Sequence, residues 1–221
     1  MSKKTIIPYQ TRLKSFSVGG LELEILTIEN LDRAIDQICE LLDPNDPLSE
    51  DLSPYFGLVW DSAVGLITYL NEISYHPLNR KHVEIGCGLA LPSFWIAKKN
   101  GEILATDSHP DVQWFLEKNQ EQNEISFPFV NWNWRTEFWS EKKADVILGS
   151  DILYESRHPK DVILSLKSML NKGGRLFLSD PGRGYLQTFH DELLLNGFKG
   201  TTHIVQGLTQ EIFVLDFHLR D

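Results

Sequence analysis

Polar and apolar residues alternate in the first part of the chain. The stretch Leu13–Thr27, LKSFSVGGLELEILT, alternates on both sides of Gly19-Gly20, which is typical of a β-hairpin. Apolar residues then follow helical spacing from Leu31 to Leu42, and Asn30 is a suitable N-cap for this helix. The next segment, DPNDPLSEDLSP, is rich in Pro, Asp and Ser and is predicted to be a loop.

Short apolar runs and amphipathic stretches alternate in the rest of the chain. The apolar runs predict strands at His82–Ile85, Ile103–Ala105, Phe127–Val130, Val146–Leu148 and Arg175–Leu178. The amphipathic stretches predict helices at Leu91–Lys99, Val112–Asn123, Lys160–Leu170 and Tyr185–Leu195, with NWNWRTEFWS as a further candidate. This alternation indicates a parallel sheet with helices on both faces. The runs FKGTTHIVQGL and EIFVLDFHLR have no helix between them, so we expect them to close the sheet as an antiparallel pair.

The pattern predicts one α/β domain with a doubly wound, Rossmann-like sheet. We expect residues 1–55 to form an N-terminal extension, with the hairpin and the first helix, and residues 56–221 to form the core. A chain of 221 residues with 42% hydrophobic and 24% charged residues suits such a globular domain. No apolar run is long enough to cross a membrane, and MSKKTIIPYQTRLKS lacks the apolar region of a secretory signal.

Charge, cysteine and histidine content narrow the expected partners. The net charge of −10 disfavours binding to nucleic acid and is compatible with a basic protein partner. Cys39 and Cys87 cannot form a disulfide framework, so we expect a reducing, cytoplasmic location. The 7 histidines lie singly, without the spacing of metal ligands, so no metal site is expected.

A strand, a Gly-x-Gly turn and a helix are predicted within HVEIGCGLALPSFWIAKK. Gly86 and Gly88 lack a Cβ, so the backbone can turn tightly and a ligand can lie against it. The next strand, ILATD, ends in Asp107, about 20 residues after Gly86, the distance at which an acid reaches ribose hydroxyls in nucleotide-binding folds. The alternative is an ordinary tight turn followed by a surface acid. The order of strand, turn, helix, strand and acid favours a ligand of the adenosine type.

The glycine loop differs from a dinucleotide fingerprint, which has a third glycine where this chain has Leu91. VEIGCGLA instead resembles the first motif of class I S-adenosylmethionine-dependent methyltransferases, acid-x-Gly-x-Gly-x-Gly, with Ala90 in place of the third glycine. The resemblance implies that the methionine part of the cofactor passes Gly86 and Gly88 and that Asp107 binds the ribose. It also implies a seven-stranded sheet that ends in an antiparallel strand.

Further segments resemble methyltransferase family 16, which contains the seven-β-strand protein lysine methyltransferases. PYFGLVWDSA resembles its Pro-aromatic-x-x-x-x-Trp-Pro-Ser-Ala segment, with Asp61 in place of the proline, and ILGSDILY resembles its Asp-x-x-Tyr motif. FVNWNW resembles the end of its third strand, where a tryptophan lies near the adenine; Trp134 is the better match and Trp132 the second. LFLSDPGRGYLQTF resembles a stretch after strand five in related bacterial proteins. The resemblance runs from about Leu13 to the C-terminus.

The resemblance implies transfer of a methyl group from S-adenosylmethionine to a protein lysine ε-amine, with S-adenosylhomocysteine as product. The amine must first lose a proton, and partial burial eases this because it lowers a lysine pKa from its usual value of about 10.4. A carboxylate and a phenol can orient the amine, and aromatic faces can hold its methylated forms. The implied catalytic residues are Asp151 and Tyr154, and the implied cofactor-binding residues are Trp60, Glu84, Gly86, Gly88, Asp107, Trp134 and Ser150.

Several of these residues have structural alternatives. Asp151 could cap a turn, Tyr154 could pack in the core, and Trp60 could be a buried residue at a helix start. For Asp180 and Arg183, a turn set by the intervening Pro-Gly is favoured over a role at the site rim. A space-filling role is favoured for Cys87, and a core position for Trp114.

Alternative functions are a small-molecule N- or O-methyltransferase, or a non-catalytic interaction module that retains the fold. A nicotinamide oxidoreductase is a more distant possibility. Methylation of nucleic acid ranks lower, because the chain lacks an Asn/Asp-Pro-Pro-aromatic motif and is acidic. We expect a protein substrate, no nucleic-acid or membrane partner, and a monomer.

Overall fold

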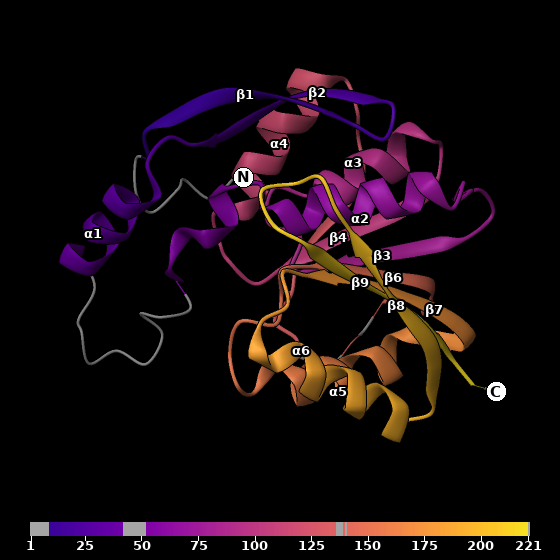
Figure 1. Cartoon of the computed structure of the whole chain (residues 1–221). Coiled ribbons are helices and arrows are strands. Elements are labelled where there is room, and N and C mark those ends of the chain that lie inside the picture. Colours follow the sequence, from indigo (N-terminus) through magenta and orange to yellow (C-terminus); the bar gives the residue numbers. More distant parts are fainter. Residues whose placement is uncertain (1–8, 42–51, 136–138, 140, 221) are drawn as a thin grey trace.

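A seven-stranded sheet forms the centre of the protein (Figure 1). The structure is a computed structural model that describes residues 9–41, 52–135, 139 and 141–220. The strand order is β5-β4-β3-β6-β7-β9-β8, and β9 is antiparallel to both of its neighbours while the other pairs are parallel. The strands are β3 (Lys81–Ile85), β4 (Glu102–Asp107), β5 (Phe129–Asn131), β6 (Ala144–Ser150), β7 (Leu170–Asp180), β8 (Phe198–Val205) and β9 (Ile212–Leu219). The predicted doubly wound sheet with an antiparallel C-terminal strand is confirmed.

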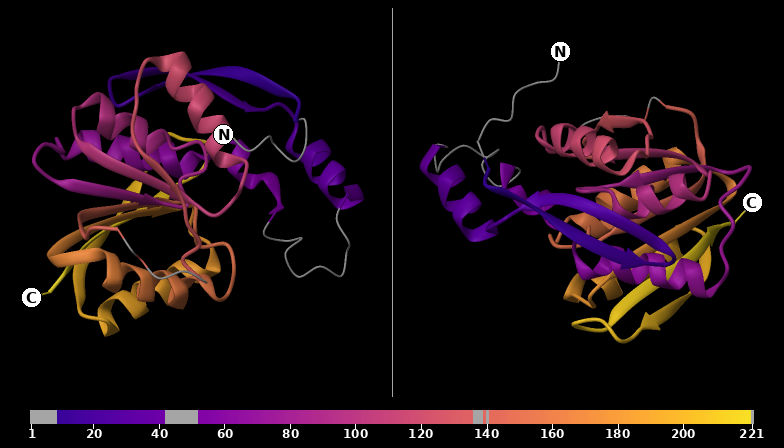
Figure 2. Two further views of the ribbon diagram at one scale, coloured as in Figure 1. Left: turned by 180° about the vertical axis from the view of Figure 1, so that it is seen from behind. Right: turned by 90° about the horizontal axis from the view of Figure 1, so that it is seen from above.

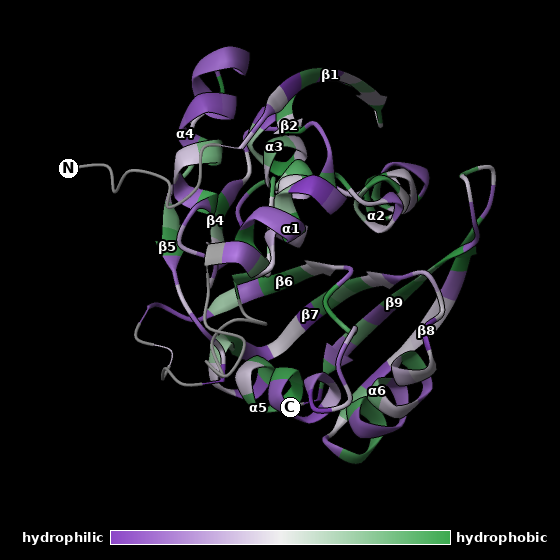
Figure 3. Ribbon diagram, turned by 90° about the vertical axis from the view of Figure 1, so that its left-hand side faces the viewer, coloured by the Kyte–Doolittle hydropathy of each residue, from purple (hydrophilic) through white to green (hydrophobic). Residues whose placement is uncertain are grey.

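Helices cover both faces of this sheet. One face is covered by α2 (Asp61–Glu72), α3 (Leu91–Lys98) and α4 (Val112–Asn123), and the other by α5 (His158–Met169) and α6 (Gly184–Leu195). Each face has its own cluster of buried apolar side chains. Strands buried on both faces need apolar residues at successive positions, which explains the nearly continuous run in β6. The outer helix α4, in contrast, is largely hydrophilic (Figure 3).

The N-terminal hairpin lies across the helices of the first face (Figure 2). It consists of β1 (Thr11–Val18) and β2 (Leu21–Ile28), joined by two glycines with positive φ. Asn119 and Asn123, one turn apart on α4, pair their amide groups with the backbone of β2. Their oxygens accept from the N–H groups of Leu26 and Glu24 at 2.6 and 2.9 Å, and their nitrogens donate back to the carbonyl groups of the same two residues. The hairpin edge that faces α4 is therefore hydrogen-bonded by side chains.

Other local predictions can be compared with the structure. The helix α1 (Leu31–Leu41) begins as predicted, and Asn30 Oδ1 accepts the N–H of Arg33 at 2.9 Å. The helical interpretation of NWNWRTEFWS does not hold for residues 131–135, which form the end of β5 and a turn; residues 136–138 and 140 lie outside the described residues. The predicted loop that follows the first helix also lies mostly outside the described residues.

Two elements precede the first strand of the sheet and were not predicted by periodicity. These are the short helix η2 (Pro54–Gly57) and the helix α2, which is buried along most of its length. Because η2 spans the expected boundary at residue 55, the division into extension and core stays a prediction. No helix among the described residues combines the length and apolar character needed to cross a membrane.

Candidate active site

The carboxyl ends of β4, β3, β6 and β7 meet at one edge of the sheet, where open α/β sheets place their ligands. A cavity of about 410 Å³ lies at this edge. It is bounded by the segment before α2, the glycine loop, and the loops after β4, β5 and β6. Eight of the nine residues implied by the resemblance line it: Trp60, Gly86, Gly88, Asp107, Trp134, Ser150, Asp151 and Tyr154.

The glycine loop forms the floor of the cavity. Gly86 and Gly88 have φ angles of +58° and +49°, a region that residues with a Cβ rarely adopt. A Cβ at Gly86 would lie 2.7 Å from Ile152 Cγ2, and one at Gly88 would lie 3.1 Å from the carbonyl oxygen of Phe56. Ala90, in place of the third glycine of the common motif, also has a positive φ of +57°. The loop conformation of the motif is therefore kept at the position where the sequence departs from it.

Glu84 lies beneath the cavity and not on its wall. Its side chain is fully buried, and Oε2 accepts the N–H of Ser93 at 2.9 Å and the Ser93 hydroxyl. Oε1 has no hydrogen-bond partner among the described residues. Burial raises the pKa of Glu84 to about 8, although both bonds from Ser93 lower it. Glu84 therefore contacts the first turn of α3 and supports the glycine loop from below.

Asp107 ends β4 with both carboxylate oxygens directed at backbone N–H groups. Oδ2 accepts from Gly88 and Oδ1 from His109, each at 2.9 Å. Burial raises the pKa of Asp107, and the backbone donors oppose this. Each carboxylate oxygen can accept a further hydrogen bond, so two oxygens remain available to vicinal hydroxyl groups.

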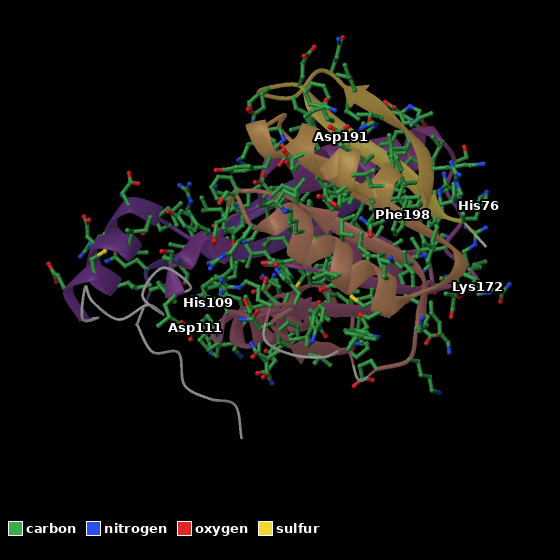
Figure 4. The ribbon with its side chains drawn as sticks, turned by 90° about the horizontal axis from the view of Figure 1, so that it is seen from below. His76, His109, Asp111, Lys172, Asp191 and Phe198 are labelled. Atoms are coloured by element: carbon green, nitrogen blue, oxygen red, sulfur yellow. The ribbon has the colours of Figure 1, made fainter. Side chains whose placement is uncertain are left out.

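The loop after Asp107 was not singled out in the sequence. Ser108 and His109 both line the cavity, and the ring of His109 stacks at 4.2 Å from that of Phe56. His109 Nδ1 accepts the N–H of Asp111 at 3.2 Å, and Nε2 donates to Leu52 O at 3.1 Å; Figure 4 shows His109 and Asp111 together. Burial lowers the pKa of His109, which keeps the ring neutral as these two bonds require. Their position directly after Asp107, the acid expected to bind ribose, was the signal that could have identified these residues.

Asp151 follows the last residue of β6 and adopts a left-handed backbone conformation, with φ of +61°. Its Oδ2 accepts the hydroxyl of Ser62 at 2.9 Å, and its Oδ1 lies 2.5 Å from Arg183 Nη1. The carboxylate thus joins the start of α2 to the loop after β7. Asp180 accepts the N–H groups of Gly182 and Arg183, both at 2.8 Å, which is the turn role that the sequence favoured.

Three aromatic side chains form an exposed rim at the cavity. Tyr55, Trp60 and Tyr154 line the cavity and are 45%, 37% and 49% exposed, so neither Trp60 nor Tyr154 is a core residue. Trp60 Nε1 donates to the carbonyl group of Tyr55 at 3.0 Å, which holds these two residues together. These three rings can therefore contact a molecule that enters the cavity.

The remaining tryptophans and Cys87 occupy different positions. Trp134 lies against Gly86 and has its ring 5.9 Å from His158, on the side of the cavity next to the loop after β6. Trp132 is buried in the core and packs against Trp139 at 5.0 Å. Cys87 is buried, and burial raises the pKa of its thiol well above the ordinary value, which suits a space-filling role.

Comparison with known proteins places this chain in a family. A family model described as lysine methyltransferase, methyltransferase family 16, matches residues 49–183, more than half of the chain. The chain belongs to this family. The match begins in the segment before α2 and ends at Arg183. It therefore includes the glycine loop, Asp107, Asp151 and Tyr154. The predicted resemblance is confirmed.

Curated relatives of the chain are protein methyltransferases with different acceptors. It is 27% identical over 133 residues to the histone-arginine methyltransferase METTL23 of Xenopus laevis, covering 57% of this chain and 56% of that protein. It is 25% identical over 146 residues to the histidine protein methyltransferase 1 homolog of Dictyostelium discoideum, covering 63% and 47%. It is 28% identical over 143 residues to the protein N-lysine methyltransferase METTL21A of Xenopus tropicalis, covering 62% and 64%. The chain spans about half to two-thirds of the length of these relatives.

Solved structures share the fold at low sequence identity. A methyltransferase from Pyrococcus furiosus superposes with a TM-score of 0.60 at 16% identity, covering 72% of this chain and 84% of that one. The magnesium protoporphyrin IX methyltransferase of Synechocystis PCC 6803 superposes with a TM-score of 0.58 at 17% identity, covering 80% and 86%. These likenesses support the Rossmann-like methyltransferase fold.

Proposed function

We propose that this chain is an S-adenosylmethionine-dependent methyltransferase that acts on a protein lysine ε-amine. Membership of the lysine methyltransferase family supports this chemistry. The observation that carries the site is the cavity at the strand ends, where the glycine loop, Asp107 and the Asp-x-x-Tyr residues come together.

The residues of the cavity fit the proposed cofactor. Asp107 can accept the ribose hydroxyls, and the glycine loop lines the cavity where the methionine part would pass. Trp134 also lines the cavity, where its ring can contact the adenine. Ser150 and Trp60 also line the cavity. When bound, S-adenosylmethionine supplies a methyl group activated by its sulfonium, and S-adenosylhomocysteine remains.

The acceptor side of the site suits an alkylammonium group. The exposed aromatic rim of Tyr55, Trp60 and Tyr154 can bind such a cation through ring faces. The carboxylates of Asp151 and Glu155 lie beyond this rim on the cavity wall. We assign Asp151 and Tyr154 the task of orienting the amine, because transfer to a nucleophile depends mainly on its position.

A basic protein is the partner that the charge favours. The net charge of −10 attracts a lysine-rich surface and repels a polyanion. We therefore propose a protein substrate and no nucleic-acid or membrane partner, with the protein acting as a cytoplasmic monomer.

Cofactor binding is the first test. Isothermal titration calorimetry with S-adenosylhomocysteine should show binding in the micromolar range, an affinity of about −8 kcal/mol. The absence of heat at millimolar ligand, for a folded sample, would contradict the proposal.

The acceptor class requires a transfer experiment. Lysate from a strain that lacks the gene is incubated with the purified protein and S-adenosylmethionine labelled in the methyl group. We expect the label in a protein band and, after hydrolysis, in methylated lysine. Label confined to the small-molecule fraction would instead make the chain a small-molecule methyltransferase, and binding without any transfer would indicate a non-catalytic module.

Two substitutions test the Asp-x-x-Tyr residues in this assay. Asp151→Asn tolerates the left-handed backbone and removes the charge, and it should lower methyl transfer by about 10²-fold while the affinity for S-adenosylhomocysteine stays nearly unchanged. Tyr154→Phe removes only the hydroxyl group and should lose less methyl-transfer activity than Asp151→Asn. A parallel loss of affinity and transfer in Asp151→Asn would assign Asp151 to the cofactor.

A further inference from the structure

The loop after the Asp-x-x-Tyr motif brings two further titratable side chains to the cavity. Glu155 and His158 both line it, with Glu155 following Tyr154 directly and His158 opening helix α5. The His158 side chain is 2% exposed and that of Glu155 is 30% exposed. The ring of Tyr154 packs edge-on against that of His158, with centroids 4.6 Å apart and planes at 85°. A buried imidazole is therefore held between the aromatic rim and a carboxylate that reaches solvent.

Hydrogen bonding defines the tautomer of His158. Nδ1 lies 2.8 Å from the carbonyl oxygen of Ile152, and because a carbonyl can only accept, Nδ1 carries the hydrogen. Nε2 lies 3.4 Å from Glu155 Oε1. In the neutral ring Nε2 has a free lone pair, and a proton added there would lie between the ring and the carboxylate. The surroundings of Nε2 thus stabilise the addition of one proton.

Charges around His158 oppose one another. Burial lowers its pKa, the carboxylate of Glu155 and the bond to Ile152 raise it, and the cations Arg135 and Arg157 lower it. Glu155 itself pairs with Arg157 at 2.6 Å, from Oε2 to Nη2. The ring is consequently neutral near pH 7 and remains able to accept a proton.

Two other titratable side chains of the cavity, Asp151 and His109, already have hydrogen-bond or ion-pair partners. Both oxygens of Asp151 are bonded, to Ser62 and to Arg183. Both ring nitrogens of His109 are bonded to backbone groups. Among these cavity-lining groups, His158 has a ring nitrogen that faces a carboxylate.

We propose that the His158–Glu155 pair accepts the proton that the acceptor ammonium must lose before methylation. The inference rests on the function proposed above. In this step an N–H bond of the ammonium breaks, its electron pair stays on nitrogen, and the proton binds His158 Nε2. Glu155 stabilises the imidazolium and passes the proton to solvent at its exposed side. The free amine pair then forms the N–C bond as the C–S bond breaks, with its electron pair left on sulfur.

The electrostatic coupling between His158 and Glu155 can be tested without a methyl acceptor. Imidazole nitrogens labelled with ¹⁵N are followed by NMR across a pH titration of the protein with S-adenosylhomocysteine bound, and His158→Asn identifies the His158 signals. We expect a neutral form with hydrogen on Nδ1 that titrates at Nε2. Glu155→Gln should lower the pKa of His158, because it removes the carboxylate that raises it. A neutral form with hydrogen on Nε2, or an unchanged pKa in Glu155→Gln, would overturn the proposal.

The pH dependence of methyl transfer tests the catalytic role. Asn at position 158 can still donate to Ile152 O but cannot take up a proton. We expect His158→Asn to lower kcat/KM by about 10²-fold near pH 7, the usual scale of acid–base catalysis, and the deficit to shrink as pH rises toward the pKa of the amine itself. A deficit of equal size at all pH values would indicate a structural role and overturn the proposal.

A second histidine–acid pair provides a matched control. His190 Nδ1 lies 3.3 Å from Asp191 Oδ1 on α6, and neither residue is among the described residues that line the cavity. Asp191 lies far from His109 in Figure 4. His190→Asn should therefore leave the pH profile unchanged. A wild type that binds no S-adenosylhomocysteine and transfers no methyl group would overturn both proposals, whereas an active wild type with parallel pH profiles overturns only the role of the pair.

Discussion

Arg183 pairs with Asp151 across the ends of two neighbouring strands. Arg183 follows β7, Asp151 follows β6, and Nη1 lies 2.5 Å from Oδ1. The same guanidinium nitrogen lies 3.1 Å from Oδ2 of Asp180, which is fully buried. Arg183 therefore forms ion pairs with two carboxylates, that of Asp151 at the cavity and that of Asp180 in the turn after β7.

Removal of this cation should destabilise the fold. Arg183→Gln leaves two largely buried carboxylates without their partner, but Arg183 is a third exposed, so we expect a loss of about 1–2 kcal/mol in the free energy of unfolding. Urea unfolding of Arg183→Gln, Asp151→Asn and the double variant measures the coupling. A coupling free energy of about 1 kcal/mol is expected, and additive losses would show that the pair contributes nothing.

Asp107→Asn should weaken binding of S-adenosylhomocysteine. The variant removes the charge that the ribose hydroxyls would meet and replaces one of the two oxygens that accept the N–H groups of Gly88 and His109 with an amide NH2 group. Hydrogen bonds to charged groups contribute about 1.5–3 kcal/mol, so calorimetry should show an affinity about 10- to 100-fold lower.

Asp145→Asn is the matched control for this substitution. Asp145 Oδ2 also accepts a backbone N–H, that of Lys81 at 2.9 Å, but at the opposite end of the sheet. The affinity of Asp145→Asn for S-adenosylhomocysteine should equal that of the wild type. A change below twofold in Asp107→Asn would remove Asp107 from the site.

The stability of the protein should depend on pH through Glu84. Its pKa in the folded state is about 8, above the ordinary value of 4.5, so the fold opposes ionisation of this residue. The unfolded chain then loses this proton at lower pH than the folded protein does, and folding weakens as pH rises from about 4.5 to about 8. Glu84→Gln has no ionisable side chain at this position, so its stability should lack this pH dependence.

Denaturant unfolding of the wild type and Glu84→Gln at about pH 5 and about pH 8.5 measures this effect. Relative to the variant, the wild type should lose on the order of 3 kcal/mol between the two values. Parallel behaviour of the two proteins would mean that Glu84 ionises normally in the fold.

The asparagine pair on α4 should stabilise the hairpin. Asn119→Ala or Asn123→Ala leaves an N–H and a carbonyl group of β2 without partners, at a cost of about 1–3 kcal/mol each. Hydrogen exchange should show faster exchange at Leu26 and Glu24. Gln113→Ala on the exposed side of the same helix removes only a bond to Glu117 and should change stability by less than about 0.5 kcal/mol.

Much of the fold was predictable because its signals are local. Strands buried on both faces need apolar runs, and the helices between them need one apolar face, so the order of elements after residue 80 is visible in the sequence. The glycine loop and Asp107 were recognisable for the same reason, since their spacing reflects one strand–turn–helix–strand unit.

Helix α2 was not predicted, although its less buried residues Asp61, Val64, Thr68 and Asn71 follow helical spacing. Ser62, Ala63, Gly65, Leu66, Ile67, Tyr69 and Leu70 are all buried between the sheet and neighbouring elements. NWNWRTEFWS was a further helix candidate, but residues 131–135 instead end β5 and turn toward the cavity.

From the sequence alone, the strands of the sheet, the helices between them after residue 80 and the residues at the strand ends could be identified. The tertiary structure alone decided which of those ends lie together, because strand order in a sheet is not set by order along the chain. The placement of β6 between β3 and β7 brings Asp151 beside Arg183 and Ser62. These contacts join residues from separate segments whose local patterns carry no information about one another.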